Sequence, residues 1–360
     1  MDFHDVLTLR AGPAARAVLA KEGLSPRHVG AMAGAAGGPK WLILSALDRY
    51  LFSDWLYRDD AAQPIDLVGS SIGAWRFAAA CHPHDPAGSI DTLERAYLDQ
   101  FYSAKPTRDE ISGTVRAILD TFLTDDVRDG VLSHPRFRMH VLTVRSRALT
   151  RSEARGALMF GSSLGALGNA FSRNSLRWFF ERVVFSRGKG GLHWADAHLG
   201  DRAIELTAAN VRDAVYASGN VPLVMRGVVD PAGAPAGVYR DGGIVDYHID
   251  QPLLASEADA PLVLMPHYDE RLVPGWFDKS LPWRRPRHAA NTLLIGPGPA
   301  LRDRLVERKV PDRKDFYRYA GRDDARLAAW QQAIDAGNLM RDAFIEFADS
   351  ADPARYVKPL

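Results

Sequence analysis

Residues 65–80 have the sequence IDLVGSSIGAWRFAAA, in which a short apolar run is followed by Gly-Ser-Ser-Ile-Gly and then by an alanine-rich run. This order predicts a strand, a tight turn and a helix. Gly69 and Gly73 give the backbone the freedom to turn sharply, so that the hydroxyl of the middle serine stands above the edge of the sheet. Ser71 is therefore the candidate nucleophile.

The chain upstream repeats this arrangement. Residues 28–34 are small and apolar, residues 35–40 form a glycine-containing loop, and residues 41–51 carry apolar side chains at helical spacing. Two successive strand–loop–helix units predict neighbouring parallel strands joined by a right-handed crossover. Further strand-like runs occur at 140–144, 262–265 and 292–296, and further helical patterns at 13–22 and 323–348.

These patterns predict one α/β domain over residues 1–360, with three α/β/α layers around a mainly parallel central sheet. Helical insertions are expected at 91–131 and 157–185, and a helical C-terminal part at 301–360.

The composition argues against a nucleic-acid-binding, disulfide-bonded or membrane-spanning protein. The 360 residues include 45 Lys and Arg against 44 Asp and Glu, so no global field steers the protein to nucleic acid, and no nucleic-acid partner is expected. Cys81 is the single cysteine, which excludes an intramolecular disulfide and a multi-cysteine metal site. Residues 1–6 do not resemble a signal peptide, and no apolar run is long enough to span a bilayer. A cytoplasmic protein is the expectation.

A second Gly-x-Ser-x-Gly pattern is centred on Ser163. Its context differs, because Ser71 directly follows a strand-like run and precedes a helical one, whereas Ser163 follows the polar residues 151–155 and only a few apolar residues. We therefore assign the nucleophile to Ser71 and expect Ser163 in a small-residue turn or a helix contact.

The upstream glycine loop offers Ser71 a means of stabilising a transition state. Acyl transfer places negative charge on the carbonyl oxygen, and adjacent glycines permit backbone conformations that aim N–H groups at it. Gly37 and Gly38 are the candidate oxyanion-hole donors, whereas Pro39 has no N–H. The alternatives are a loop that only closes a turn and a phosphate-binding loop, although this stretch lacks the full nucleotide-binding signatures.

Asp241 is the candidate general base. It follows a strand-like run and precedes Gly242 and Gly243, which allow a loop to carry its carboxylate towards another loop. A free aspartate with a pKa of ~3.9 is a weak base for a serine hydroxyl, so the site must raise its basicity by desolvation or a close hydrogen bond.

Histidines downstream of this aspartate keep a Ser-Asp-His triad open as a second interpretation, with His248, His267 or His288 as the base. It ranks lower because a triad has no need of the Asp-Gly-Gly sequence. The histidine pairs within 82–84 and 193–198 lack a recognisable ligand pattern, so we expect no metal and no cofactor.

The order of these motifs resembles the patatin-like phospholipase family, including its bacterial members. That family has a glycine loop of the pattern Asp-Gly-Gly-Gly-x-Arg/Lys-Gly; residues 36–41, AGGPKW, match it at both glycines and the lysine and depart from it at the alanine and the tryptophan. Residues 217–222, ASGNVP, are similar to the Ala-Ser-x-x-x-Pro block that precedes the dyad aspartate. The resemblance covers residues 29–247 in motif order.

This resemblance implies a patatin-like fold and cleavage of ester bonds in phospholipids and other acyl lipids by a Ser-Asp dyad without histidine. Ser71 would attack the ester carbonyl, Asp241 would take its proton, and the N–H groups of Gly37 and Gly38 would hold the oxyanion before water hydrolyses the acyl-enzyme. Lys40 would orient the loop or meet a lipid phosphate, with a solvated lysine as the default. A lipid-binding protein of this fold that has lost turnover is the alternative from a different class.

Residues 157–185 combine bulky apolar side chains with Arg173, Arg177 and Arg182. A buried helix is the simpler interpretation. The alternative is an interfacial helix or lid that contacts lipid, and it predicts a peripheral membrane contact.

Overall fold

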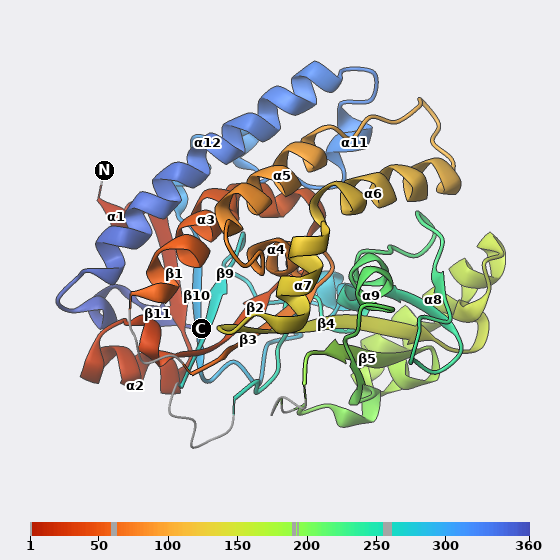
Figure 1. Cartoon of the computed structure of the whole chain (residues 1–360), viewed down its shortest axis with the longest axis horizontal. Helices are drawn as coiled ribbons and strands as arrows, with labels where there is room; N and C mark the ends of the chain where they lie inside the picture. Colours follow the sequence, from red (N-terminus) through yellow and green to blue (C-terminus); the bar gives the residue numbers. More distant parts are fainter. Residues whose placement is uncertain (1, 59–62, 189–191, 193, 255–260) are drawn as a thin grey trace.

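The computed structural model describes residues 2–58, 63–188, 192, 194–254 and 261–360 (Figure 1). These residues form an 11-stranded sheet. Its strands are β1 (Leu7–Ala11), β2 (Val29–Gly34), β3 (Ile65–Ser70), β4 (Phe137–Ser146), β5 (Phe180–Ser186), β6 (Arg202–Glu205), β7 (Val228–Val229), β8 (Val238–Asp241), β9 (Leu262–Pro266), β10 (Thr292–Pro297) and β11 (Lys358–Pro359).

The spatial order of the strands is β11-β1-β10-β9-β2-β3-β4-β5-β6, and β8 pairs with both β4 and β7. The five consecutive strands β10, β9, β2, β3 and β4 run parallel, whereas β1 and β5 are antiparallel to their inner neighbours. The expectation of a mainly parallel central sheet is therefore confirmed.

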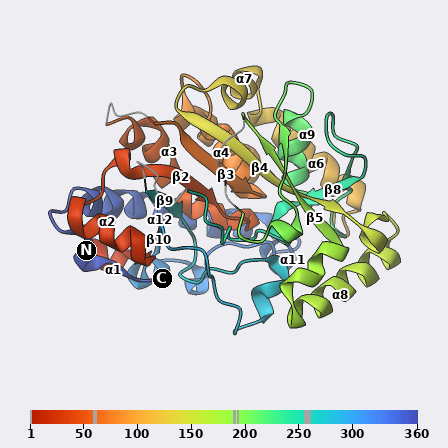
Figure 2. The same ribbon diagram turned by 90° about the horizontal axis from the view of Figure 1, so that it is seen from below.

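Helices flank this sheet and give the three expected layers. Figure 1 shows α3, α4, α5 and α12 packed beside one another along the sheet, and Figure 2 shows α2 and α8 at opposite ends of the molecule. The helices are α1 (Phe3–Val6), α2 (Pro13–Glu22), α3 (Ser45–Ser53), α4 (Ile72–Ala80), α5 (Pro86–Leu98), α6 (Arg108–Phe122), α7 (Asp125–Ser133), α8 (Arg155–Phe171), α9 (Val211–Ser218), α10 (Pro299–Arg302), α11 (Asp315–Arg318) and α12 (Asp323–Ala348). Among the described helices, none combines the length and apolar character needed to cross a bilayer.

Burial explains why the centre of the sheet has a nearly continuous apolar sequence. Every residue of β2 and β3 is buried, as expected for parallel strands covered on both faces. Every residue of α4 is buried as well. Its one charged side chain, Arg76, donates two hydrogen bonds of 2.7 Å to the buried carboxylate of Asp48, because a buried charge is tolerated only when it is paired.

Most of the expected elements are present, but two segments differ. The expected strands at 28–34, 65–70, 140–144, 262–265 and 292–296 and the helices at 13–22 and 323–348 are confirmed, several with wider bounds. The expected helical insertion at 157–185 is wrong over its last part, because residues 180–186 form β5, whose β-branched and aromatic side chains suit a strand. The helix expected at 41–51 begins instead as the 3₁₀ helix η2 (Gly38–Leu44) and continues as α3.

Candidate active site

Ser71 lies between the end of β3 and the start of α4, with backbone angles φ 55° and ψ −127°. This conformation costs a residue with a side chain ~1–3 kcal/mol, and such strain concentrates at functional sites. A Cβ atom on Gly73 would lie 2.0 Å from the carbonyl oxygen of Gly34, so only glycine allows the elbow to pack against the end of β2. The strand–turn–helix predicted around Ser71 is confirmed.

Asp241 lies within hydrogen-bond reach of this serine. The Ser71 hydroxyl donates to Oδ2 of Asp241 at 2.9 Å, and Oδ1 of the same carboxylate accepts the N–H of Gly243 at 2.7 Å. Both dyad residues are 5% exposed. The distance between Ser71 Oγ and Asp241 Oδ2 is therefore short enough for direct proton transfer, and no described histidine lies between the two groups.

The register of the sheet explains how residues 170 positions apart meet. Ser70, at the end of β3, pairs with Leu142 of β4, and the next residue of β4, Thr143, pairs with Asp241 at the end of β8. Since β4 pairs with both strands, it places Ser71 and the Asp241 carboxylate at the same edge of the sheet.

Residues 217–222 support both members of the dyad. Ser218 Oγ accepts the backbone N–H of Ser71 at 2.9 Å and donates to the carbonyl of Leu142 at 2.6 Å. The carbonyl of Asn220 accepts the N–H of Asp241 at 3.0 Å. The sequence marked this block only by its resemblance to a motif, and its positioning role becomes visible only in three dimensions.

Burial raises the pKa of Asp241 above its ordinary range, because a low-dielectric site disfavours the carboxylate. The charge of Arg313, the hydrogen bonds from Gly243 and Ser71, and the charge of Lys279 act in the opposite direction. The net rise makes this aspartate a stronger base than a solvated one, as the chemistry of a serine nucleophile requires.

The glycine loop begins beside the dyad. The Ala36 N–H donates to the carbonyl of Tyr247 at 2.8 Å, and the Ala36 carbonyl accepts a hydrogen bond from the Tyr268 hydroxyl. Because the C=O and N–H of a trans peptide point in opposite directions, this bond turns the Gly37 N–H away from Tyr268. Among the described residues, no acceptor is bound to the N–H groups of Gly37 or Gly38. Their assignment as oxyanion donors stays a prediction.

Two loop residues have clear positions. The Lys40 ammonium lies 4.6 Å from the centre of the Tyr268 ring, and burial lowers the pKa of this lysine, so it is not the freely solvated lysine taken as the default. The Trp41 side chain is fully buried and packs edge-on against Tyr97 at 5.9 Å. It therefore belongs to the core and does not obstruct the loop.

The structure places none of the three histidines of the triad interpretation in hydrogen-bond contact with the dyad. His248 Nε2 lies 2.9 Å from the Tyr268 hydroxyl, and its Nδ1 accepts the N–H of Val273 at 2.9 Å. His267 contacts the backbone of Asp269 through Nδ1, and the backbone of His288 donates to Asp250. In the described part of the chain, no histidine is hydrogen-bonded to either member of the dyad.

The remaining sequence candidates lie away from the dyad. Ser163 lies within α8 and is exposed, so the expected small-residue turn or packed helix contact is wrong for this residue. Cys81 is buried, which raises the pKa of its thiol to about 12. The described residues contain no group of three or more His, Cys, Asp or Glu side chains that could hold a metal ion, and His193 lies outside the described residues.

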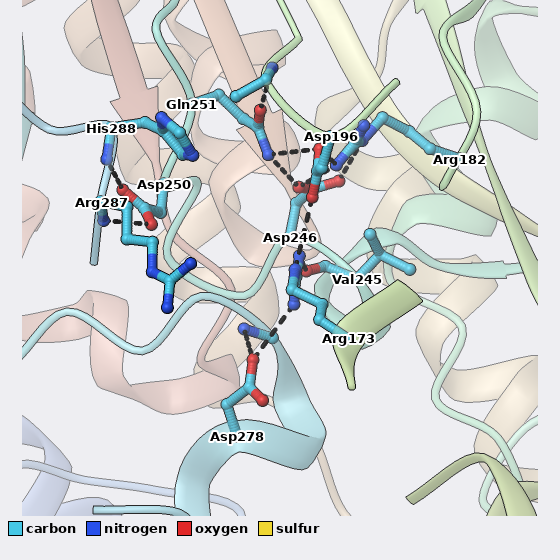
Figure 3. A network of polar contacts seen from close by, with 12 residues as sticks. Arg173, Arg182, Asp196, Val245, Asp246, Asp250, Gln251, Asp278, Arg287 and His288 are labelled. Atoms are coloured by element: carbon cyan, nitrogen blue, oxygen red, sulfur yellow. Dashed lines mark hydrogen bonds and ion pairs between the residues drawn. The ribbon is translucent and has the colours of Figure 1, made fainter. Parts of the chain in front are cut away.

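A buried polar network anchors the chain that follows the dyad aspartate (Figure 3). Arg182 is fully buried and donates to Asp246 at 2.6 and 2.8 Å and to Asp196 at 2.7 Å. Arg173 donates to the Val245 carbonyl at 2.6 Å. The sequence interpretation that grouped Arg182 with a lipid-facing surface is therefore wrong, because Arg182 is buried and paired with Asp246 and Asp196.

Replacement of Arg182 by alanine should destabilise the protein by ~3–5 kcal/mol, because it leaves the buried Asp246 carboxylate without its cation. Urea denaturation measures this loss, with Arg155→Ala as the control at an exposed arginine. Arg182→Met combined with Asp246→Leu should recover much of the loss. A change below ~1 kcal/mol for Arg182→Ala would contradict this role of the network.

A small cavity opens beside Asp241. Its wall contains Tyr247, Trp276 and Arg313, which were not candidate site residues, together with Val221, Pro222, Gly243 and Ile244. Only the aromatic and basic character of the first three gave any sequence signal. The site combines a strained serine, a buried carboxylate that accepts its hydroxyl, and glycine N–H groups with no acceptor among the described residues. Such a set is suited to acyl transfer. No protein-family model and no curated protein sequence matches this chain, so its function is inferred from the geometry of this site.

Proposed function

We propose that this protein is a serine carboxylic-ester hydrolase of the patatin type that cleaves acyl lipids through a Ser71–Asp241 dyad. The observation that carries the proposal is the 2.9 Å hydrogen bond from the Ser71 hydroxyl to Oδ2 of Asp241, formed at a strained strand-to-helix turn. A serine held in this conformation and donating to a buried carboxylate has little structural use, because an unstrained residue would close the same turn at lower free energy.

The dyad performs both proton transfers of ester hydrolysis. Asp241 takes the proton of Ser71 as Oγ attacks the ester carbonyl, and it returns that proton to the departing alcohol. Water then attacks the acyl-enzyme, Asp241 removes a proton from this water, and Ser71 regains a proton as the acid leaves. In this mechanism the N–H groups of Gly37 and Gly38 stabilise the oxyanion of each tetrahedral intermediate.

Labelling with a fluorophosphonate probe tests this proposal. Wild-type protein should be modified on Ser71, as read by peptide mass spectrometry, and Ser71→Ala should not react. Folded wild-type protein that neither reacts with the probe nor hydrolyses any ester would favour a lipid-binding protein without turnover. Labelling that depended on His248 would favour the triad.

The exposed face of α8 supports a lipid substrate. Phe160, Leu164, Leu167 and Phe171, termed here the α8 stripe, follow one another at spacings of four, three and four residues and are 37–87% exposed. Trp178 adds a further exposed aromatic ring. An apolar stripe of this kind at the surface suits insertion into the interfacial layer of a membrane.

Charge around the α8 stripe favours an anionic membrane over another protein surface. Arg151, Arg155 and Arg177 are exposed, and none of them forms an ion pair with another described residue. The nearby Glu153 is already paired with Arg240. We therefore extend the proposal to a cytoplasmic protein that attaches reversibly to an anionic lipid surface.

Phe160→Ser combined with Phe171→Ser should weaken binding to phosphatidylcholine vesicles containing phosphatidylglycerol at least about 10-fold, because two large apolar side chains no longer enter the lipid. Vesicle sedimentation measures this effect, and Tyr317→Ser is the control at an aromatic residue that is 81% exposed elsewhere. Equal binding by all three proteins would contradict the membrane contact. A dimer that the double variant dissociates would assign the α8 stripe to a second copy of the chain.

A further inference from the structure

Cationic side chains gather at the cavity beside the dyad. Arg313 lines this cavity together with Asp241, and its side chain would lie 3.1 Å from a Cβ atom on Gly38. The ammonium of Lys279 lies 3.8 Å from the centre of the ring of Tyr247, another residue of the cavity wall. Arg313 therefore packs against the glycine loop and shares the cavity wall with Asp241, while the Lys279 ammonium lies over the ring of Tyr247 in the same wall.

Among the described residues, no carboxylate forms an ion pair with Arg313 or Lys279. Neither Arg313 nor Lys279 forms an ion pair or a side-chain hydrogen bond with any residue that the structure describes. The acids in the neighbourhood are engaged: the Asp241 carboxylate binds Ser71 and Gly243, and Asp312 pairs with Lys309 at 3.2 Å. Basic side chains elsewhere in the interior of this protein, such as Arg76 and Arg182, are paired with carboxylates.

Repulsion between neighbouring unpaired cations raises the electrostatic free energy of this site. Burial of the ammonium and the charges of Lys40 and Arg313 lower the pKa of Lys279 to about 7. Asp241 and Asp312 offset this effect in part. The electrostatic cost falls when an anion enters between the cations, so the arrangement suits a ligand that brings a negative charge with it.

We propose that Arg313 and Lys279 bind an anionic oxygen group, phosphate or carboxylate, on the ester substrate while its carbonyl lies at Ser71. The arginine provides a planar fork of donors and the lysine a point charge, a combination that fits a tetrahedral or planar oxyanion. This inference rests on the proposed esterase function and adds to it a preference for acidic over neutral acyl esters.

Hydrolysis of a matched pair of lipids tests this preference. Wild-type protein should cleave 1-acylglycerol 3-phosphate with a higher kcat/KM than the 1-acylglycerol of the same chain length. Arg313→Gln and Lys279→Gln should each lower the ratio of these two kcat/KM values about 10-fold or more, since one charge-assisted contact is lost. Lys314→Gln, at the exposed lysine next to Arg313, should leave the ratio unchanged. An unaltered ratio in both cavity variants would overturn the anion site while leaving the esterase intact.

Binding without turnover separates this inference from the proposed function. In a Ser71→Ala background, glycerol 3-phosphate should raise Tm, and adding Arg313→Gln should abolish the shift. Inorganic phosphate alone, tested in parallel, distinguishes recognition of a free anion from recognition of a lipid headgroup. Equal Tm shifts with and without Arg313 would overturn the proposal, and a shift that depends on Arg313 would support it even if no ester were cleaved.

Discussion

Ser71→Ala is expected to lower kcat/KM for ester hydrolysis by about 10⁴-fold or more, because it removes the oxygen that forms the acyl-enzyme in the proposed mechanism. The variant should remain folded, since alanine keeps the backbone N–H that donates to Ser218. Hydrolysis of 4-nitrophenyl butyrate and the circular dichroism spectrum measure the two effects together.

Two companion variants make this result specific. Ser163→Ala changes the other Gly-x-Ser-x-Gly serine, which is exposed on α8, and should retain full activity. Ser71→Gly should be as inactive as Ser71→Ala but about 1 kcal/mol more stable, because glycine accepts a φ of 55° without strain. Loss of hydrolysis in Ser163→Ala with retention in Ser71→Ala would place the active site elsewhere.

The turn at Ser71 and its candidate base, Asp241, could be proposed from the sequence because a local pattern marks each of them. A strand-like run, two glycines around a serine and an alanine-rich helix define the turn within 16 residues, and Asp-Gly-Gly marks the other partner. The central strands were equally visible, since parallel strands buried on both faces have short apolar sequences.

The rest of the site depends on pairings between distant segments. Asp241 reaches Ser71 only because β4 pairs with both β3 and β8, and no local pattern specifies that register. Arg313 lies beyond the last recognisable motif, and nothing in its sequence context places it against the glycine loop. The arginine and aromatic residues of β5 fit an amphipathic helical pattern, so the sequence predicts a helix there. Pairing with β4 makes this segment a strand instead.

Asp241→Asn is expected to lower kcat about 10³-fold or more at neutral pH, because the amide cannot accept the proton of Ser71. The fold should be retained, since the asparagine carbonyl can still accept the Gly243 N–H and its amide can donate to Ser71 Oγ. In contrast, His248→Gln, His267→Gln and His288→Gln should each retain hydrolysis. An inactive histidine variant beside an active Asp241→Asn variant would exclude the dyad.

The pH dependence of kcat/KM and of Tm tests the role of Asp241 independently of the effect of the substitution on kcat. Burial raises the pKa of Asp241, so kcat/KM of the wild-type protein should fall as pH decreases through that raised pKa, at a pH above the ordinary range of an aspartate. The same shift means that the folded protein binds this proton more tightly than the unfolded chain does. Ionised Asp241 therefore destabilises the fold above its raised pKa, and the penalty disappears as pH falls towards the unfolded value. Asp241→Asn should accordingly match or exceed the Tm of wild-type protein at neutral pH, and the difference should vanish in acid. A variant less stable than the wild-type protein at neutral pH would contradict the destabilisation expected from the buried carboxylate.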